Sequence, residues 1–139
     1  MISFVLDRGK VVHGLASTGF TGTTPHDTAA IDRLGFNSAL IILNYSAGTS
    51  GTITPTFYDG ATSSPADAVT LETAAAAINV ASAGSTIMQV DLSGFNRYFK
   101  VTLTPALGGN TSNITATVIL FDAVSDPGSG TAVTPLRKA

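Results

Sequence analysis

Short runs of β-forming residues, each followed by a turn rich in Gly, Asn, Asp or Ser, recur along the whole chain. In several runs apolar side chains alternate with polar ones, which is the two-residue period of a strand with one buried face. No segment carries the apolar stripe of a long amphipathic helix. About eight such runs predict an all-β domain, either an antiparallel β-sandwich or a jelly-roll-like fold. The clearest runs are 36–45, 52–58, 86–92, 97–104 and 114–121.

Composition within the runs predicts where individual strands lie. Run 36–45 is apolar on both parities, so we expect a central strand with both faces covered. Pro55 cannot donate a hydrogen bond to a neighbouring strand, so its run, 52–58, is expected at an edge or a bulge. A further short strand is expected at 69–71. The alanine run that follows, 74–77, is too short to form a helix that is stable by itself.

The same alternation predicts which side chains form the core. In each strand, the parity that carries the larger apolar residues is expected to face the opposite sheet. The residues expected in the core are Leu40, Ile42, Phe57, Val90, Phe99, Val101, Leu103 and Val118.

The N-terminal region lacks the clear pattern of the later runs. Alternating apolar residues in 2–6 and a turn at 7–9 predict an opening hairpin with 10–13. The stretch 14–29 is rich in Gly, Thr and Ser and shows little periodicity, which is typical of a long surface loop. An arm that becomes ordered against a neighbouring subunit is the alternative. Phe20, its one large apolar residue, would then pack on its own domain or anchor the arm to a partner.

These patterns divide the chain into three parts. Residues 1–30 form an extended N-terminal region, with the hairpin and a Gly/Thr-rich arm or loop. Residues 31–125 form the β-sandwich core, and a turn rich in Pro and Gly separates it from a C-terminal tail, 126–139.

Charge is sparse, which indicates a protein that assembles. Only 12% of the 139 residues are charged, about half the usual share, so much of the surface is expected to lie against other subunits. We therefore expect a homo-oligomer. The net charge is −2 and the seven basic residues are scattered, which argues against nucleic-acid binding. The chain has no cysteine, and neither a signal peptide nor a membrane span is expected from it.

Candidate catalytic groups are few. His13 and His26 are the only side chains with an ordinary pKa near neutrality, and no nucleophile elbow or phosphate-binding glycine loop occurs. His26 and Asp27 are sequence neighbours, which point to opposite sides of an extended chain and so do not form a catalytic pair. We expect no enzyme activity and no cofactor.

The carboxylates are nearly all aspartates at strand ends or turns, where they accept backbone N–H bonds. They lack the regular spacing of a calcium loop, so we expect no metal site. Tyr45, Tyr58 and Tyr98 could instead form an aromatic platform for a sugar, although packing is the commoner use of tyrosines within strands. A binding module for glycans is therefore the alternative function.

Two passages match each other, since each places an Asp and then a Gly before an aromatic-led β run. They are Ile31-Asp-Arg-Leu-Gly-Phe36 and Val90-Asp-Leu-Ser-Gly-Phe-Asn-Arg-Tyr98. Together with Asp59-Gly60 and Val101-Thr-Leu-Thr-Pro105, they resemble small β-structured proteins of tailed-phage virions, especially capsid decoration (cement) proteins. The resemblance covers about 31–124; the acidic cluster expected near Asp59 is missing. From the residues themselves, we expect Asp32 and Asp91 to accept backbone N–H bonds at the strand entries.

The resemblance implies a structural protein on the capsid surface, assembled in the host cytoplasm and bound to the major capsid protein, which it stabilises. It also implies that the oligomer is a trimer. Candidate partner-binding residues are Phe4, Phe20 and Tyr58. The alternative is a tail or fibre-associated β-sandwich module that recognises host-surface glycans.

Overall fold

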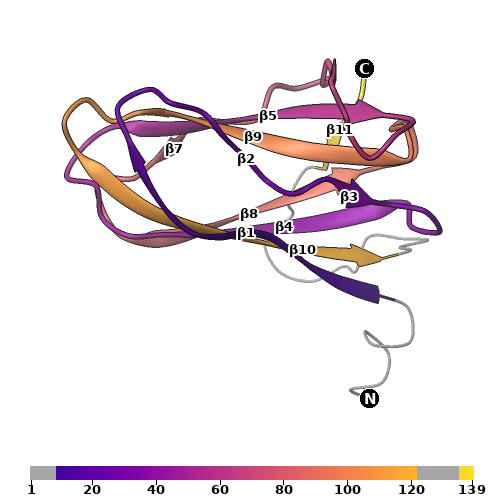
Figure 1. Ribbon diagram of the computed structural model, residues 1–139, viewed down its shortest axis with the longest axis horizontal. Coiled ribbons are helices and arrows are strands. Elements are labelled where there is room, and N and C mark those ends of the chain that lie inside the picture. The colour runs from indigo at the N-terminus through magenta and orange to yellow at the C-terminus, as the bar shows by residue number, and fades with distance from the viewer. Residues whose placement is uncertain (1–8, 122–134) are drawn as a thin grey trace.

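The computed structural model describes residues 9–121 and 135–139, which form two stacked sheets and no helix (Figure 1). The predicted all-β sandwich is confirmed. The described residues form eleven strands, because several short pairings add to the longer ones. Sheet A contains, in order, β1 (Gly9–Thr21), β10 (Thr111–Phe121), β4 (Ser38–Tyr45), β8 (Gly84–Asp91) and β11 (Leu136–Arg137). Sheet B contains, in order, β2 (His26–Asp27), β9 (Tyr98–Ala106), β5 (Thr52–Gly60) and β6 (Asp67–Ala68), with β3 (Ile31–Asp32) also on β9 and β7 (Ile78–Asn79) also on β5.

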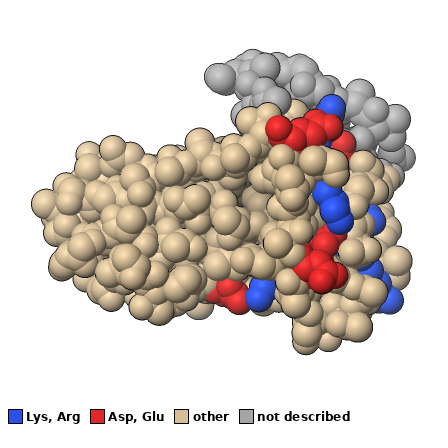
Figure 2. Space-filling view, turned by 90° about the horizontal axis from the view of Figure 1, so that it is seen from above, with Lys and Arg blue, Asp and Glu red and all other residues tan. Residues whose placement is uncertain are grey.

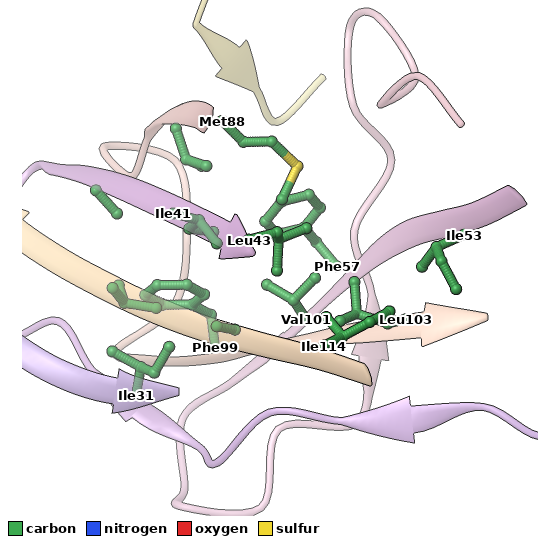
Figure 3. Packing of buried hydrophobic residues seen from close by; sticks show 14 of the residues in the cluster. Ile31, Ile41, Leu43, Ile53, Phe57, Met88, Phe99, Val101, Leu103 and Ile114 are labelled. Carbon is green, nitrogen blue, oxygen red and sulfur yellow. The ribbon is translucent and has the colours of Figure 1, made fainter. Parts of the chain in front are cut away.

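The core lies between the two sheets and is built from alternate residues of the long strands (Figure 3). Six of the eight expected core residues are buried there: Phe57, Val90, Phe99, Val101, Leu103 and Val118. The other two, Leu40 and Ile42, are a correction, because they are only half-buried on the outer face of sheet A. In β4 the buried parity is Ala39, Ile41 and Leu43.

The strand β4 is central, as predicted, between β10 and β8. The edge position predicted for Pro55 is also confirmed. On the side of β5 away from β9, β7 pairs with Thr52 and Ile53, and β6 pairs with Tyr58 and Asp59. Pro55 lies in the interval between them, where its missing N–H costs no ladder hydrogen bond.

The expectation of a loop or arm at 14–29 is wrong for its first half. Strand β1 continues to Thr21 and pairs with β10 along its whole length. Its register shifts between His13 and Leu15 and again between Leu15 and Thr18. Such irregularities break the two-residue period, which is why the sequence shows no alternation there. The 2–6 half of the expected hairpin lies outside the described residues.

Of the predicted tail 126–139, residues 126–134 lie outside the described residues, and the last few residues are paired. Leu136 and Arg137 form β11, which pairs parallel to Val90 and Asp91 of β8. Lys138 forms an isolated β-bridge with Leu71, which follows the edge strand β6 of sheet B, so these residues connect β8 to the segment after β6. The short strand expected at 69–71 lies earlier, at Asp67–Ala68, and 74–77 is irregular chain without a helix.

Candidate functional site

The two matched passages fold into aspartate-anchored turns, as predicted. Oδ1 of Asp32 accepts the N–H of Leu34 at 3.0 Å. Oδ1 of Asp91 accepts the N–H of Ser93 at 3.0 Å and its hydroxyl at 2.7 Å. Each carboxylate therefore satisfies a donor that would otherwise be free where the chain turns. Gly35 has a φ of 86°, a left-handed conformation that suits glycine.

The two turns lie side by side, and two arginines connect them. Arg97 donates through Nε and Nη2 to the two carboxylate oxygens of Asp32, at 3.1 and 2.8 Å. In the other direction, Arg33 donates from Nε to the carbonyl of Asn96 at 2.9 Å, and its guanidinium also reaches the carbonyl of Phe95. The matched passages thus form one structural unit at one end of the sandwich. Sequence reasoning missed both arginines, because their partners lie more than sixty residues away.

A buried ion pair lies at the same end of the sandwich. The side chain of Asp59 is 1% exposed, and its Oδ2 accepts from Lys138 Nζ at 2.9 Å and from the N–H of Asn96 at 2.8 Å. Burial raises the pKa of Asp59, but the two donors outweigh it and hold the pKa below its ordinary value. The sequence did carry a signal for burial, since Asp59 continues the buried parity of Ile53, Pro55 and Phe57.

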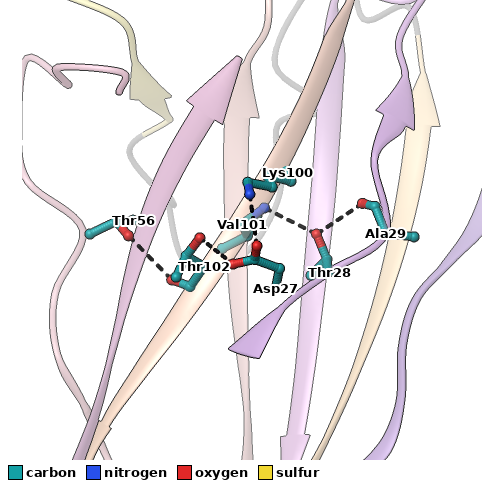
Figure 4. A network of polar contacts seen from close by, with 7 residues as sticks. All are labelled: Asp27, Thr28, Ala29, Thr56, Lys100, Val101 and Thr102. Atoms are coloured by element: carbon teal, nitrogen blue, oxygen red, sulfur yellow. Dashed lines mark hydrogen bonds and ion pairs between the residues drawn. The ribbon is translucent and has the colours of Figure 1, made fainter. Parts of the chain in front are cut away.

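The outer face of sheet B carries a polar network centred on Asp27 (Figure 4). Its carboxylate accepts from Lys100 Nζ at 2.7 Å and from the Thr102 hydroxyl at 2.6 Å, and both bonds lower the pKa of Asp27. Thr28 accepts the N–H of Val101 through its hydroxyl oxygen at 3.0 Å. These contacts tie the short strand β2 to β9. Lys100 also lies over the ring of Tyr58, 5.4 Å from its centroid.

Charged side chains gather in one half of the molecule. On the face shown in Figure 2, Lys, Arg, Asp and Glu occupy the half that contains the matched turns, and the other half shows none. The loops at that second end consist of uncharged residues, many of them Gly, Ala, Ser and Thr: 22–25, 46–51, 80–83 and 107–110. The sandwich therefore has one charged and one uncharged end.

The structure describes two of the three predicted partner-binding residues, Phe20 and Tyr58, and they lie apart. Phe20 is fully buried in β1 and stacks on His26 with ring centroids 4.3 Å apart, so its side chain faces the core and not a partner. Tyr58 is half-buried on the outer face of sheet B. Phe4 lies outside the described residues.

The three tyrosines of the expected sugar platform also separate. Tyr58 and Tyr98 lie on neighbouring strands of sheet B, whereas Tyr45 lies in sheet A, where its hydroxyl is 3.4 Å from that of Thr86. Among residues 9–121 and 135–139, no three His, Cys, Asp or Glu side chains are grouped as metal ligands would be. The part of the chain that the structure describes also has no helix that could cross a membrane.

Acid should destabilise this end of the sandwich. Hydrogen bonds from Arg97 and the Leu34 N–H lower the pKa of Asp32 to about 2, and the pKa values of Asp27, Asp59 and Asp91 are also below 3.8. A carboxyl group whose pKa is lower in the folded than in the unfolded protein stabilises the fold when the pH is above its unfolded-state pKa. This stabilisation is lost as the pH falls through its folded-state pKa. We expect a constant urea midpoint from pH 7 to about 5 and a decline from about pH 4 to 2. Asp32→Asn should flatten that decline; a midpoint that holds to pH 2 would contradict the assignment.

Comparison with known proteins identifies solved structures of similar fold. No family model and no curated protein matches the chain. The PBSX exported protein XepA is similar, with a TM-score of 0.51, 17% identity and coverage of 94% of this chain and 42% of that one. A chain of the infectious bursal disease virus Gx strain is similar, with a TM-score of 0.51, 12% identity and coverage of 86% and 33%.

A pilus protein of Bacillus endospore appendages, described as disulfide-linked, gives a TM-score of 0.43, 19% identity and coverage of 84% and 92%. The chain spans less than half the length of the XepA and bursal disease virus chains. At these identities the likeness concerns the fold alone, which the chain shares with parts of XepA and of the infectious bursal disease virus chain.

Proposed function

We propose that the chain is a structural virion protein of a tailed phage and, more specifically, a capsid decoration (cement) protein that binds the major capsid protein and stabilises the shell. The observation that carries the proposal is the unit formed by the matched turns. The residues that gave the resemblance to decoration proteins, around Asp32 and Asp91, lie together in space and are joined by Arg33 and Arg97. The fold shared with parts of XepA and of a chain of infectious bursal disease virus supports it.

The physical character of the molecule suits such a role. A cement protein needs a rigid body and many weak contacts that symmetry repeats, and it needs no catalytic group. The two sheets are joined by a continuous apolar core, and the charged end is cross-linked by ion pairs over long sequence separations. In this proposal the protein has no enzyme activity, sits on the capsid surface and assembles in the host cytoplasm.

A glycan-binding module of a tail or fibre is the second candidate, favoured by Tyr58 and Tyr98 on one sheet with Lys100 beside them. A tyrosine combines an apolar ring with a polar hydroxyl, which suits a surface where one side stacks on a ligand and the other stays wet. In this case Tyr58, and not the matched turns, would carry the function.

The copy number in the virion distinguishes the two. Virions would be purified and the chain quantified against the major capsid protein by mass spectrometry. Decoration predicts copies in the hundreds, in proportion to the shell, whereas a tail or fibre module predicts a handful. A ratio that matches a tail component, or absence from purified virions, would refute the cement role.

A further inference from the structure

The last five residues of the chain, 135–139, lie beside β8 and include β11, the yellow strand in Figure 1. We call this segment the clasp. On one side, Leu136 and Arg137 pair parallel with the last two residues of β8. On the other side, Lys138 forms its isolated β-bridge with Leu71. The clasp therefore lies between the edge of sheet A and the segment that follows β6.

Polar contacts hold the clasp in place. The backbone N–H of Glu72 donates to the carbonyl of Arg137 at 2.8 Å, and the N–H of Ala139 donates to the carbonyl of Thr70 at 2.7 Å. Two ion pairs, at 3.4 and 2.9 Å, join the side chains of Arg137 and Lys138 to aspartates of the sandwich. The clasp is thus attached by a few bonds, which come from consecutive residues.

The clasp contributes little to the hydrophobic core. Among the described residues, the buried apolar side chains that form the core all lie between Phe20 and Leu120. Leu136 packs against this cluster from the clasp, and it is only half-buried. Because the burial of apolar side chains is the main force that holds the two sheets together, the sandwich keeps this force when the clasp is out of place.

We propose that the clasp is a releasable element, which leaves β8 and the 70–72 segment while the rest of the sandwich stays folded. Parts of a protein with few buried apolar contacts open at a lower free energy than its core does. Release frees the edge of β8 at Val90 and Asp91, and it removes the ammonium group of Lys138 from the buried carboxylate of Asp59. A free strand edge is a template for pairing with another chain, so the closed clasp protects this edge from such contacts.

Native-state hydrogen exchange of the full chain, followed by NMR, measures the opening of individual N–H groups. The N–H of Glu72 reports on the clasp, because its acceptor is the carbonyl of Arg137. The N–H of Ile41 reports on the whole sandwich, because Ile41 lies in the central strand between β10 and β8. We expect the protection factor of Glu72 to be at least about 100-fold lower than that of Ile41.

A disulfide between β8 and β11 gives a matched control. Asp91 and Arg137 are register partners, and neighbouring strands lie about 4.8 Å apart, a Cα separation that a disulfide can span. In the full chain with Asp91→Cys and Arg137→Cys, the clasp can leave in the reduced form and is fixed in the oxidised form. Oxidation should lower the ratio of the Ile41 protection factor to that of Glu72 by at least about 10-fold.

Each comparison can overturn the proposal. Equal protection of Glu72 and Ile41 in the wild type would mean that the clasp opens only when the whole sandwich unfolds. A ratio that oxidation leaves unchanged would mean that Glu72 is exposed by movement of its own segment. The first comparison needs no substitution, so it decides the question even where the double variant does not fold. The inference goes beyond the cement role, and the virion copy number is independent of both results.

Discussion

Replacement of Phe99 by alanine is expected to lower the free energy of unfolding by about 3–5 kcal/mol, because it removes a large side chain from the centre of the core. Phe99 is fully buried, packs edge-on against Phe95 with ring centroids 5.9 Å apart, and pairs across sheet B with Ile31. The sheets cannot close around the space that the ring leaves, since both are held by long ladders on either side. The cavity therefore lowers the free energy of unfolding in addition to the loss of buried apolar surface.

Urea unfolding followed by circular dichroism measures this effect. Thr104→Ala is the control on the same strand, because Thr104 lies on the outward parity of β9 and is only half-buried. The free energy of unfolding of Thr104→Ala is expected to lie within about 0.5 kcal/mol of the wild-type value. A loss below about 1 kcal/mol for Phe99→Ala would contradict the placement of this side chain between the sheets.

Replacement of Lys138 by methionine is expected to cost about 3 kcal/mol near pH 7. The carboxylate of Asp59 is 1% exposed and would keep its hydrogen bonds from Asn96 but lose the ammonium group that neutralises it. Removing one partner of a buried ion pair destabilises a protein more than replacing both partners, because it leaves a buried charge uncompensated. Because the side chain of Lys138 is 30% exposed, we expect the lower end of the range for broken buried pairs, which is about 3–5 kcal/mol.

Two further variants separate this explanation from a general effect of altering the chain end. Arg137→Met removes the neighbouring ion pair, but Arg137 is 55% exposed and 3.4 Å from Asp91, so its expected cost is below about 1 kcal/mol. Asp59→Asn combined with Lys138→Met removes both charges and should recover most of the lost stability. Equal losses in Lys138→Met and Arg137→Met would show that the buried carboxylate is not the cause.

Sequence by itself determined the features that depend on neighbouring residues. The all-β class, the strands at 52–58 and 97–104 and their buried parities follow from clean alternation, which a strand imposes on any half-buried segment. The aspartate-anchored turns follow from the short reach of the Asp side chain to the N–H two residues on. The edge position of Pro55 follows from its missing N–H.

Tertiary structure decided the features for which the local pattern was ambiguous or silent. In β4 both parities are apolar, so only the register with β10 and β8 places Ile41 inside and Leu40 and Ile42 on the outer face. In β1 the register shifts remove the alternation that would have revealed the strand, and so Phe20 was expected in a loop. The pair of Asp59 and Lys138 joins residues 79 positions apart, and no local signal specifies a contact across that distance. Strand β11 is likewise held by β8 and not by its own two residues, because so short a strand has no stability without a partner.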